Sequence, residues 1–389
     1  MEAWRKIRLG DACVTNADSY SPKEEWKFVN YLDTGNITDN RIDSIQYIDV
    51  ENDKLPSRAR RKVKKDSIIY STVRPNQRHF GIIKTQPENF LVSTGFAVID
   101  VDANVLNSDF LYYLLTQPTL VETLHAIAEQ STSAYPSIKP SDIEDLEIEV
   151  PDLATQKRIA DILGSLDGKI AQNAAINENL LQQAQALYKD RFVDLNPFDG
   201  EIPMDWHLGT VSEIIELHDS KRIPLSSRER ANLAKIYPYY GATSVMDYVD
   251  RYLFDGIYLL LAEDGTVVDS KGFPILQYVE GKFWANNHAH IITGKNGFTV
   301  ETLYLLFSLT NVQSIVTGAV QPKISQANLN KVSVVIPSEA ELSAFNSIVQ
   351  PIFAQIRNLR AENDRLAATR DTLLPRLMSG ELDVSSIDF

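Results

Sequence analysis

Positively charged side chains gather in one stretch of the sequence, between Lys54 and Lys84. Ten lysines and arginines lie there against a single acidic residue, Asp66, so the stretch carries +9 although the whole chain carries −14. Such a cluster is costly without an anionic partner, and phosphates suit it because each neutralised phosphate releases condensed counterions. The stretch therefore predicts contact with nucleic acid. The alternative is a solvated basic loop, or one that pairs with acidic surface elsewhere on the chain.

Base edges are read by Arg, Lys, Asn, Gln and hydroxyl side chains that loops present to a groove. More than half of the contacts in a usual protein–DNA interface go to the backbone instead, so many of these residues are expected at phosphates. The candidates in the first half of the chain are Arg58, Arg60, Arg61, Lys62, Lys64, Lys65, Arg74, Asn76, Gln77, Arg78 and His79. Those in the second half, which has no comparable charge cluster, are Lys221, Arg222, Arg228, Arg230, Tyr239, Tyr240, Thr243, Ser244, Gln321 and Lys323.

Motifs for catalysis are largely missing. The nearest match to a methyltransferase motif, Asn196-Pro197-Phe198-Asp199, lacks the second proline and indicates a linker turn. No Gly-x-x-x-x-Gly-Lys-Ser/Thr loop is present, which excludes an ATP-driven motor of that type. We therefore expect neither catalytic residues nor a cofactor in this chain.

A nuclease set remains an alternative. Asp264 or Asp269 with Glu280 and Lys282 could hold Mg²⁺ and activate water. Acidic-x-Lys triplets are common by chance, however, and Glu280-Gly281-Lys282 has the pattern of a turn between strands. A self-contained Mg²⁺-dependent DNA nuclease is thus kept only as a second hypothesis.

A metal site is not expected. His288 and His290 would share one face of a strand, but a tetrahedral site needs further ligands and no cysteine is available for it. The interpretation we favour is that one of them forms part of a polar or DNA-facing surface. Cys13, the only cysteine, is expected in the core and excludes an intrachain disulfide.

Length and composition indicate a globular chain of more than one domain. The 389 residues exceed what one core usually organises, and 44% hydrophobic with 23% charged residues is close to the globular average. No run of 18 apolar residues exists, and Met1–Lys6 lacks the apolar stretch of a signal peptide. We therefore expect a cytoplasmic protein without a membrane partner.

An internal repeat organises the whole sequence. At a constant offset of 186, the segment 136–151 superposes on 322–337, and in both copies alternating apolar residues before a proline predict a strand. The offset continues into two segments whose apolar residues recur every 3.5 positions, which is typical of coiled coils. Asn177 and Asn363 share one seam position, so antiparallel pairing is expected to bring their amides together. Gly164-Ser165 and Pro351 predict a bend or restart in each helix.

The repeat predicts an α+β chain in which two mixed α/β domains are separated by two long antiparallel coiled-coil helices. Other similar segments support the repeat, since 111–115 and 303–307 resemble each other and both look like helix starts. The expected divisions are a first domain over 1–152, a long helix over 153–195, a second domain over 196–337, a long helix over 338–380 and a tail over 381–389.

The repeated parts resemble a known family. The segment 151–163, Pro-Asp-Leu-Ala-Thr-Gln-Lys-Arg-Ile-Ala-Asp-Ile-Leu, resembles the central conserved region of specificity subunits of Type I restriction–modification systems. The segment 373–382, Leu-Leu-Pro-Arg-Leu-Met-Ser-Gly-Glu-Leu, resembles their usual C-terminal ending, and 239–243 looks like part of their target-recognition domains. The sequence departs from the family pattern at Thr155, and at Leu342-Ser343, where the second copy lacks a Gln-Lys pair.

The resemblance implies a division of labour. Each target-recognition domain would bind one half of a bipartite site on double-stranded DNA. The helices would space the domains and dock two methyltransferase subunits, and restriction and motor subunits would be further partners. A third hypothesis is a coiled-coil scaffold whose two domains bind proteins, which the strongly acidic remainder of the chain supports.

Overall fold

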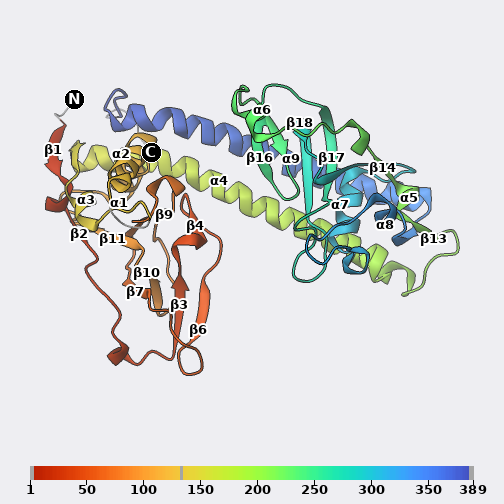
Figure 1. The fold of residues 1–389 in the computed structure, drawn as a ribbon, viewed down its shortest axis with the longest axis horizontal. Coiled ribbons are helices and arrows are strands. Elements are labelled where there is room, and N and C mark those ends of the chain that lie inside the picture. The colour runs from red at the N-terminus through yellow and green to blue at the C-terminus, as the bar shows by residue number, and fades with distance from the viewer. Residues whose placement is uncertain (1–3, 132–134, 385–389) are drawn as a thin grey trace. The chain divides into compact units, whose positions relative to one another are not determined.

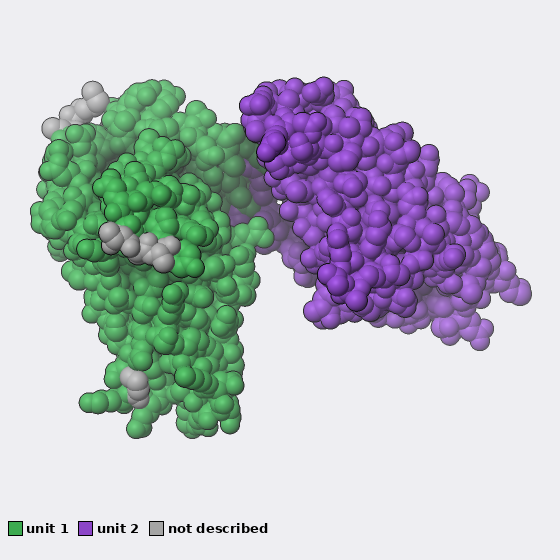
Figure 2. Space-filling model, in the orientation of Figure 1, with its two compact units in different colours: residues 1–170, 364–389 green, residues 171–363 purple. Residues whose placement is uncertain are grey.

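The computed structural model describes residues 4–131 and 135–384. It divides into two compact units, each containing part of both long helices (Figures 1 and 2). Unit 1 comprises residues 1–170 and 364–389, and unit 2 comprises residues 171–363. The predicted class is confirmed: two sheet-rich domains are separated by long helices that pack antiparallel.

Unit 1 contains a framework sheet with strand order β2-β11-β8-β9 and a second sheet with order β6-β3-β10-β7. Figure 1 shows the second sheet at the end of unit 1 that lies away from α4. Beside these sheets, β1 pairs with β12 and β4 pairs with β5, both antiparallel. The elements are β1 (Arg5–Arg8), β2 (Cys13–Thr15), β3 (Phe28–Leu32), β4 (Ile37–Thr38), β5 (Arg41–Ile42), β6 (Gln46–Asp49), β7 (Ala59–Lys62), β8 (Ile68–Ser71), β9 (Phe80–Ile82), β10 (Phe90–Ser93), β11 (Phe96–Val101), α1 (Ser108–Leu115), α2 (Pro118–Glu129), α3 (Pro140–Glu144) and β12 (Glu147–Val150).

Unit 2 contains a single large sheet with strand order β14-β19-β17-β18-β15-β16, and β13 pairs separately with β20. Two glycines, Gly256 and Gly281, lie opposite each other in the β17–β18 ladder, both with positive φ. The elements are β13 (His207–Thr210), α5 (Val211–Ile214), β14 (Ile215–Leu217), α6 (Ser227–Ala231), β15 (Tyr237–Tyr240), β16 (Val245–Val249), β17 (Phe254–Ala262), β18 (Leu276–Ala285), β19 (Ala289–Gly294), α7 (Val300–Ser308), α8 (Gln326–Leu329) and β20 (Ser333–Ile336).

The sequence repeat corresponds to a repeat of topology. The order β2-β11-β8-β9 in unit 1 matches β14-β19-β17-β18 in unit 2, and the pair β1–β12 matches β13–β20. The strands predicted before the two prolines are β12 and β20, so these predictions are confirmed. The segments predicted as helix starts are helical, but each lies inside its helix, since α1 begins at Ser108 and α7 at Val300. The predicted turn at Glu280-Gly281-Lys282 is wrong, because these residues lie inside β18.

The two long helices are α4 (Leu153–Tyr188) and α9 (Glu339–Met378). Both run without interruption through Gly164-Ser165 and Pro351, so the predicted restart does not occur. In unit 2, Asn173 of α4 meets Asn363 of α9, with Nδ2 and Oδ1 2.9 Å apart. The prediction that Asn177 pairs with Asn363 is therefore one helical turn wrong. The side-chain oxygen of Asn177 is buried without a hydrogen-bond partner among the described residues.

In unit 1 the framework sheet packs on the helices through one continuous core, which includes Leu163 of α4 and Leu377 of α9. A polar contact fixes the same interface: the Tyr113 hydroxyl donates to Asp167 of α4 (2.7 Å), and Arg370 of α9 donates to the same carboxylate (2.7 Å). Burial raises the pKa of Tyr113, so the hydroxyl stays a donor. The thiol of Cys13 lies in this core, and burial raises its pKa to about 12.

Unit 2 is attached to the helices in an equivalent way. Glu301 of α7 is 3% exposed and accepts hydrogen bonds from the Tyr278 hydroxyl of β18 (2.7 Å) and from Arg357 of α9 (3.0 Å). Burial alone would raise the pKa of Glu301, but the hydrogen bonds from Gln350 and Tyr278 bring it below its ordinary value. Both units are thus held to α9 by an arginine that meets a tyrosine–carboxylate pair.

Candidate nucleic-acid interface

The same pair of loops recurs in both units beside the framework sheet. One loop follows β8 or β17, and the other precedes α3 or α8. We call the first pair, residues 72–78 with 135–138, the unit 1 paired-loop site. The second pair, residues 263–266 with 317–324, is the unit 2 paired-loop site.

Matched backbone hydrogen bonds define this framework. In unit 1, Thr72 N donates to Gly95 O (2.8 Å), Ile138 N to Thr72 O (2.9 Å) and Arg74 N to Pro136 O (2.9 Å). The same three bonds recur in unit 2 with other residues. They run from Glu263 N to His288 O (2.8 Å), from Ile324 N to Glu263 O (2.9 Å) and from Gly265 N to Pro322 O (3.0 Å). The isolated bridges Val73–Ser137 and Asp264–Lys323 match as well.

One backbone frame therefore carries two different sets of side chains. In unit 1 the frame presents Arg74, Asn76 and Gln77, all exposed. In unit 2 it presents Gln321 and Lys323, also exposed, beside the half-buried Asp264. Five of the side chains named from sequence as base-reading candidates thus lie in the two paired-loop sites, three on the first loop of unit 1 and two on the second loop of unit 2.

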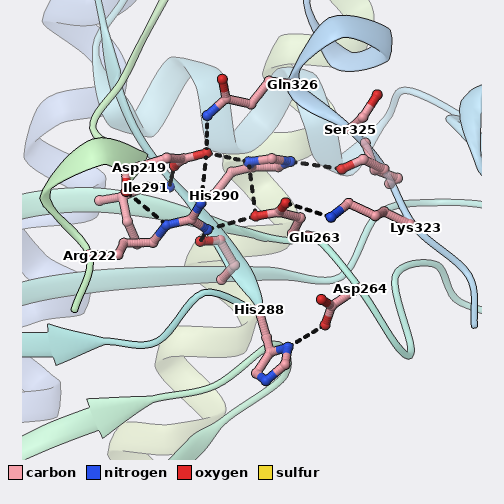
Figure 3. Close-up of polar contacts among 12 residues, drawn as sticks. Asp219, Arg222, Glu263, Asp264, His288, His290, Ile291, Lys323, Ser325 and Gln326 are labelled. Atoms are coloured by element: carbon pink, nitrogen blue, oxygen red, sulfur yellow. Dashed lines mark hydrogen bonds and ion pairs between the residues drawn. The ribbon is translucent and has the colours of Figure 1, made fainter. Parts of the chain in front are cut away.

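The unit 2 site rests on a buried polar cluster centred on Asp219 (Figure 3). His290 is fully buried, with Nδ1 2.6 Å from Asp219 Oδ2 and Nε2 2.8 Å from the carbonyl oxygen of Ile324. Asp219 also accepts from the amide of Ile291 (2.8 Å) and from Gln326 Nε2 (2.5 Å). These contacts join β19 to the second loop of the site, so the cluster fixes where that loop lies.

Two cations complete the cluster. Arg222 Nη1 lies 2.7 Å from Glu263 Oε2, and Lys323 Nζ lies 3.1 Å from Glu263 Oε1. Burial alone would raise the pKa of Glu263 and of Asp219. The hydrogen bond from Arg222 to Glu263 and that from His290 to Asp219 outweigh burial and lower both pKa values, so both carboxyls are ionised at neutral pH.

The cluster contains the atoms of a metal site but already has cations of its own. Ligand atoms of Asp219, Glu263 and His290 lie within 4.8 Å of one another, which defines a possible site among the described residues. Arg222 and Lys323 already neutralise these carboxylates. We therefore assign the cluster to positioning rather than to metal binding.

His288 does not belong to this cluster. Its Nδ1 contacts Asp264, and its side chain is 42% exposed, so the ring lies at the surface of the unit 2 site (Figure 3). Asp264 is committed to this contact, whereas Glu280 pairs with Arg357 and Lys282 lies over the Tyr252 ring. The metal-ligand group found among the described residues includes neither Asp264 nor Glu280. The geometry thus gives no support to the nuclease set.

The basic stretch is partly neutralised by acidic residues from elsewhere in unit 1, as the alternative interpretation held. The ion pairs are Lys62 with Glu24 and Asp18, Lys64 with Asp100, Arg78 with Asp39, and Lys84 with Asp66 and Asp109. His79 contacts the Ile37 carbonyl through Nδ1 (2.6 Å). Arg58, Lys65 and Arg74 are exposed, and no ion pair involves them or Arg60 and Arg61 within the described part of unit 1. With Lys54, which is also exposed and in no described ion pair, these residues are the six cations left for phosphate.

Besides Lys323, which pairs with Glu263 but stays exposed, three of the unit 2 candidates are engaged inside the unit. Tyr239 is 1% exposed, with its hydroxyl at the Leu225 backbone. Arg230 is 9% exposed and pairs with Asp247, while Arg222 belongs to the buried cluster. We therefore leave these three out of the interface, because DNA could reach them only after the unit rearranged. Tyr240 is half-buried against Phe283, whereas Lys221, Arg228, Thr243 and Ser244 are exposed outside the paired loops.

Sequence reasoning missed Asp219 and Glu263 altogether. The available signal was the exact offset of 186 between Pro136-Ser137-Ile138 and Pro322-Lys323-Ile324, which marks the second loop of each pair. The first loops are related by a different offset, since Arg74 matches Gly265, so a constant offset could not align them.

Comparison with known proteins agrees with this architecture of two similar units and two long helices. The family model described as Type I restriction modification DNA specificity domain matches residues 1–182 and 203–367. The chain is 24% identical over 462 aligned residues to the Type I restriction enzyme HindI specificity subunit of Haemophilus influenzae, covering 98% of this chain and 100% of the relative. It is 28% identical to the MjaIX specificity subunit of Methanocaldococcus jannaschii, over 72% of this chain and 70% of the relative.

A solved structure shares the fold. The crystal structure of a Type I restriction–modification S subunit from M. genitalium aligns with a TM-score of 0.57 at 19% identity, covering 97% of this chain and 96% of that one. The chain belongs to the Type I restriction–modification DNA specificity family. It is a DNA-binding specificity subunit, the non-catalytic part of such a system. Among the described residues, no helix combines the length and the apolar character needed to span a membrane.

Proposed function

We propose that each unit reads one half of a bipartite DNA site through its paired-loop site. The observation that carries this proposal is the matched backbone frame with different side chains, described above. Equal frames present their loops to DNA in equal ways, while different side chains select different bases. This combination suits a protein that reads two unlike half-sites.

The long helices have the complementary role in this proposal. α4 and α9 hold the two units at a set separation and dock two methyltransferase subunits, and restriction and motor subunits join the complex. Methylation and cleavage are then carried out by these partner chains. The scaffold hypothesis, in which the two domains bind proteins, gives no reason for exposed unpaired cations such as Arg58, Lys65 and Arg74.

Selection from a randomised duplex library tests the proposed function. The chain, assembled with its methyltransferase subunits, is expected to enrich two short constrained blocks separated by a gap of fixed length and free sequence. The scaffold hypothesis predicts no enrichment. One uninterrupted block would show that the units do not read separate half-sites.

Salt dependence should separate free cations from paired ones. Replacing Arg58 and Lys65 by alanine is expected to weaken binding to every sequence and to flatten the slope of log affinity against log salt by about two units, since each phosphate contact contributes ~0.9. The matched control replaces Lys62 and Lys84, whose charges already face Glu24, Asp66 and Asp109. We expect its slope to change far less. Equal slopes for both double variants would place the free cations away from DNA.

The helix pair should act as a ruler. Adding one heptad to α4 directly after Asn173 and one to α9 directly before Glu362 lengthens both helices on the same side of the Asn173–Asn363 contact. Seven residues add ~10 Å, about three base pairs of DNA at ~3.4 Å each. The gap selected from a random-spacer library is expected to lengthen accordingly. Retention of the original gap would refute the ruler, and a heptad in α4 alone is the mismatched control.

A further inference from the structure

Arg74 adopts a backbone conformation that arginine normally avoids. Its φ is +48°, in the left-handed region, and the matching residue of the unit 2 frame is Gly265, with φ +84°. The frame thus demands a left-handed residue at this position, which glycine supplies without strain and a residue with a Cβ supplies at a cost. Strained residues of this kind cluster at functional sites. The cost indicates that the Arg74 side chain has a use.

That use is not found inside the unit. The Arg74 side chain is exposed, and no hydrogen bond or ion pair involves its guanidinium within the described part of unit 1. Its one described contact is the ring of Tyr135, 5.1 Å from Arg74 Cζ, in the second loop of the same site. Arg78, also left-handed, is the contrast: its Nε lies 2.6 Å from Asp39, and its guanidinium lies over Phe80.

When an arginine stacks on an aromatic ring, the ring restricts the plane of the guanidinium and leaves the N–H donors at its edge available. A guanidinium whose plane is fixed loses less freedom when it forms two parallel hydrogen bonds. The base edge that accepts two such bonds from arginine in the major groove is guanine, through O6 and N7. Neighbouring Asn76 and Gln77 are exposed on the same loop, as Arg74 itself is.

We propose that Arg74, set by its left-handed backbone and by Tyr135, reads a guanine in the half-site of unit 1. The inference rests on the proposed function and adds a base-reading residue to it. Position 265 of unit 2 carries no side chain, so the recognition there must come from other residues of its site. The two half-sites therefore differ in whether this position of the frame reads a base.

The test replaces Arg74 by glycine, the residue that the frame of unit 2 uses. Arg74→Gly is expected to keep or raise the midpoint of thermal unfolding, because it removes the strain, and to relax the preference for one guanine about 5- to 150-fold. The half-site that is retained when residues 196–337 are exchanged identifies unit 1's target. Each guanine of that half-site is then replaced in turn by 7-deazaguanine, which lacks N7.

Coupling between the residue and the base decides the outcome. One 7-deazaguanine is expected to weaken the wild-type complex at least about fivefold and to leave the Arg74→Gly complex unaffected. Arg74→Lys keeps the charge without the planar fork and should lose most of the guanine preference. Arg58→Gly, at an exposed arginine without positive φ, should weaken all sequences alike.

Three results would overturn the inference: a unit 1 half-site without guanine, an unchanged base profile in Arg74→Gly, or a loss of thermal stability that accounts for its weaker binding. These differ from failure of the proposed function, in which the wild-type complex itself selects no bipartite site.

Discussion

Exchange of residues 196–337 for the second domain of another specificity subunit should replace one half-site completely and leave the other unchanged. This segment contains the unit 2 paired-loop site and the buried cluster beneath it. It also keeps β13 and β20 together, so the exchanged domain brings its own paired ends. The attachment to α9 through Arg357 lies outside the segment, and a donor with the Tyr278–Glu301 pair should restore it.

Methylation mapping of DNA from cells that carry the exchanged chain with its partners measures this directly. The matched control exchanges only residues 263–266 and 317–324, and it should alter the same half-site within the original fold. A change in both half-sites would contradict the assignment of one half-site to each unit.

Replacement of Asp219 by alanine is expected to destabilise unit 2 by about 3–5 kcal/mol, because the change leaves a buried charged network without its central carboxylate. Asp219 is 8% exposed and accepts from His290, Gln326 and the Ile291 amide. Binding to the second half-site should fall with stability, since the second loop loses its anchor. Glu216→Ala, on the exposed face of neighbouring β14, is the control and should change stability by no more than about 0.5 kcal/mol.

The sign of the pH dependence follows from the lowered pKa of Asp219. A carboxyl whose pKa is lower in the folded state stabilises the fold above its unfolded pKa of about 4 and loses this contribution as the pH falls through the folded value. The free energy of unfolding of unit 2 can be measured in urea, with hydrogen exchange in β17 and β19 as the readout. It should therefore fall more steeply with acid in wild type than in Asp219→Ala. A variant as stable as the Glu216 control would show that the cluster does not hold the unit together.

The repeated strands and helices could be predicted from the sequence, because the spacing of apolar residues reflects which side chains are buried. Strands β12 and β20 and the two long helices follow from alternating or 3.5-residue apolar patterns at the offset of 186, whereas the segments of α1 and α7 resemble each other at an offset of 192. Asn76, Gln77 and Gln321, named as candidates from residue type, are exposed in the paired-loop sites, and their contact with bases stays a prediction.

What the sequence could not predict depends on partners distant along the chain. Arg230 and Arg222 resemble DNA-facing cations until Asp247 and Glu263 are seen to pair with them. The asparagine register fails for the same reason, because a 3.5-residue pattern identifies the seam but not which turn of α9 faces Asn173. Gly281 pairs with Gly256 of β17 in a continuous ladder, so a sequence that resembles a turn lies inside a strand.

Site-specific photo-crosslinking tests the central claim most directly. A benzophenone side chain placed at Gln77, in the unit 1 paired-loop site, and at Gln321, in that of unit 2, reports which DNA bases each loop approaches. Met204, fully exposed in the linker outside both sites, is the control position. On the selected bipartite duplex, Gln77 should crosslink to one half-site and Gln321 to the other. Crosslinks from both positions to the same half-site would contradict the account. So would a crosslinking yield at Gln77 and Gln321 no higher than that at Met204.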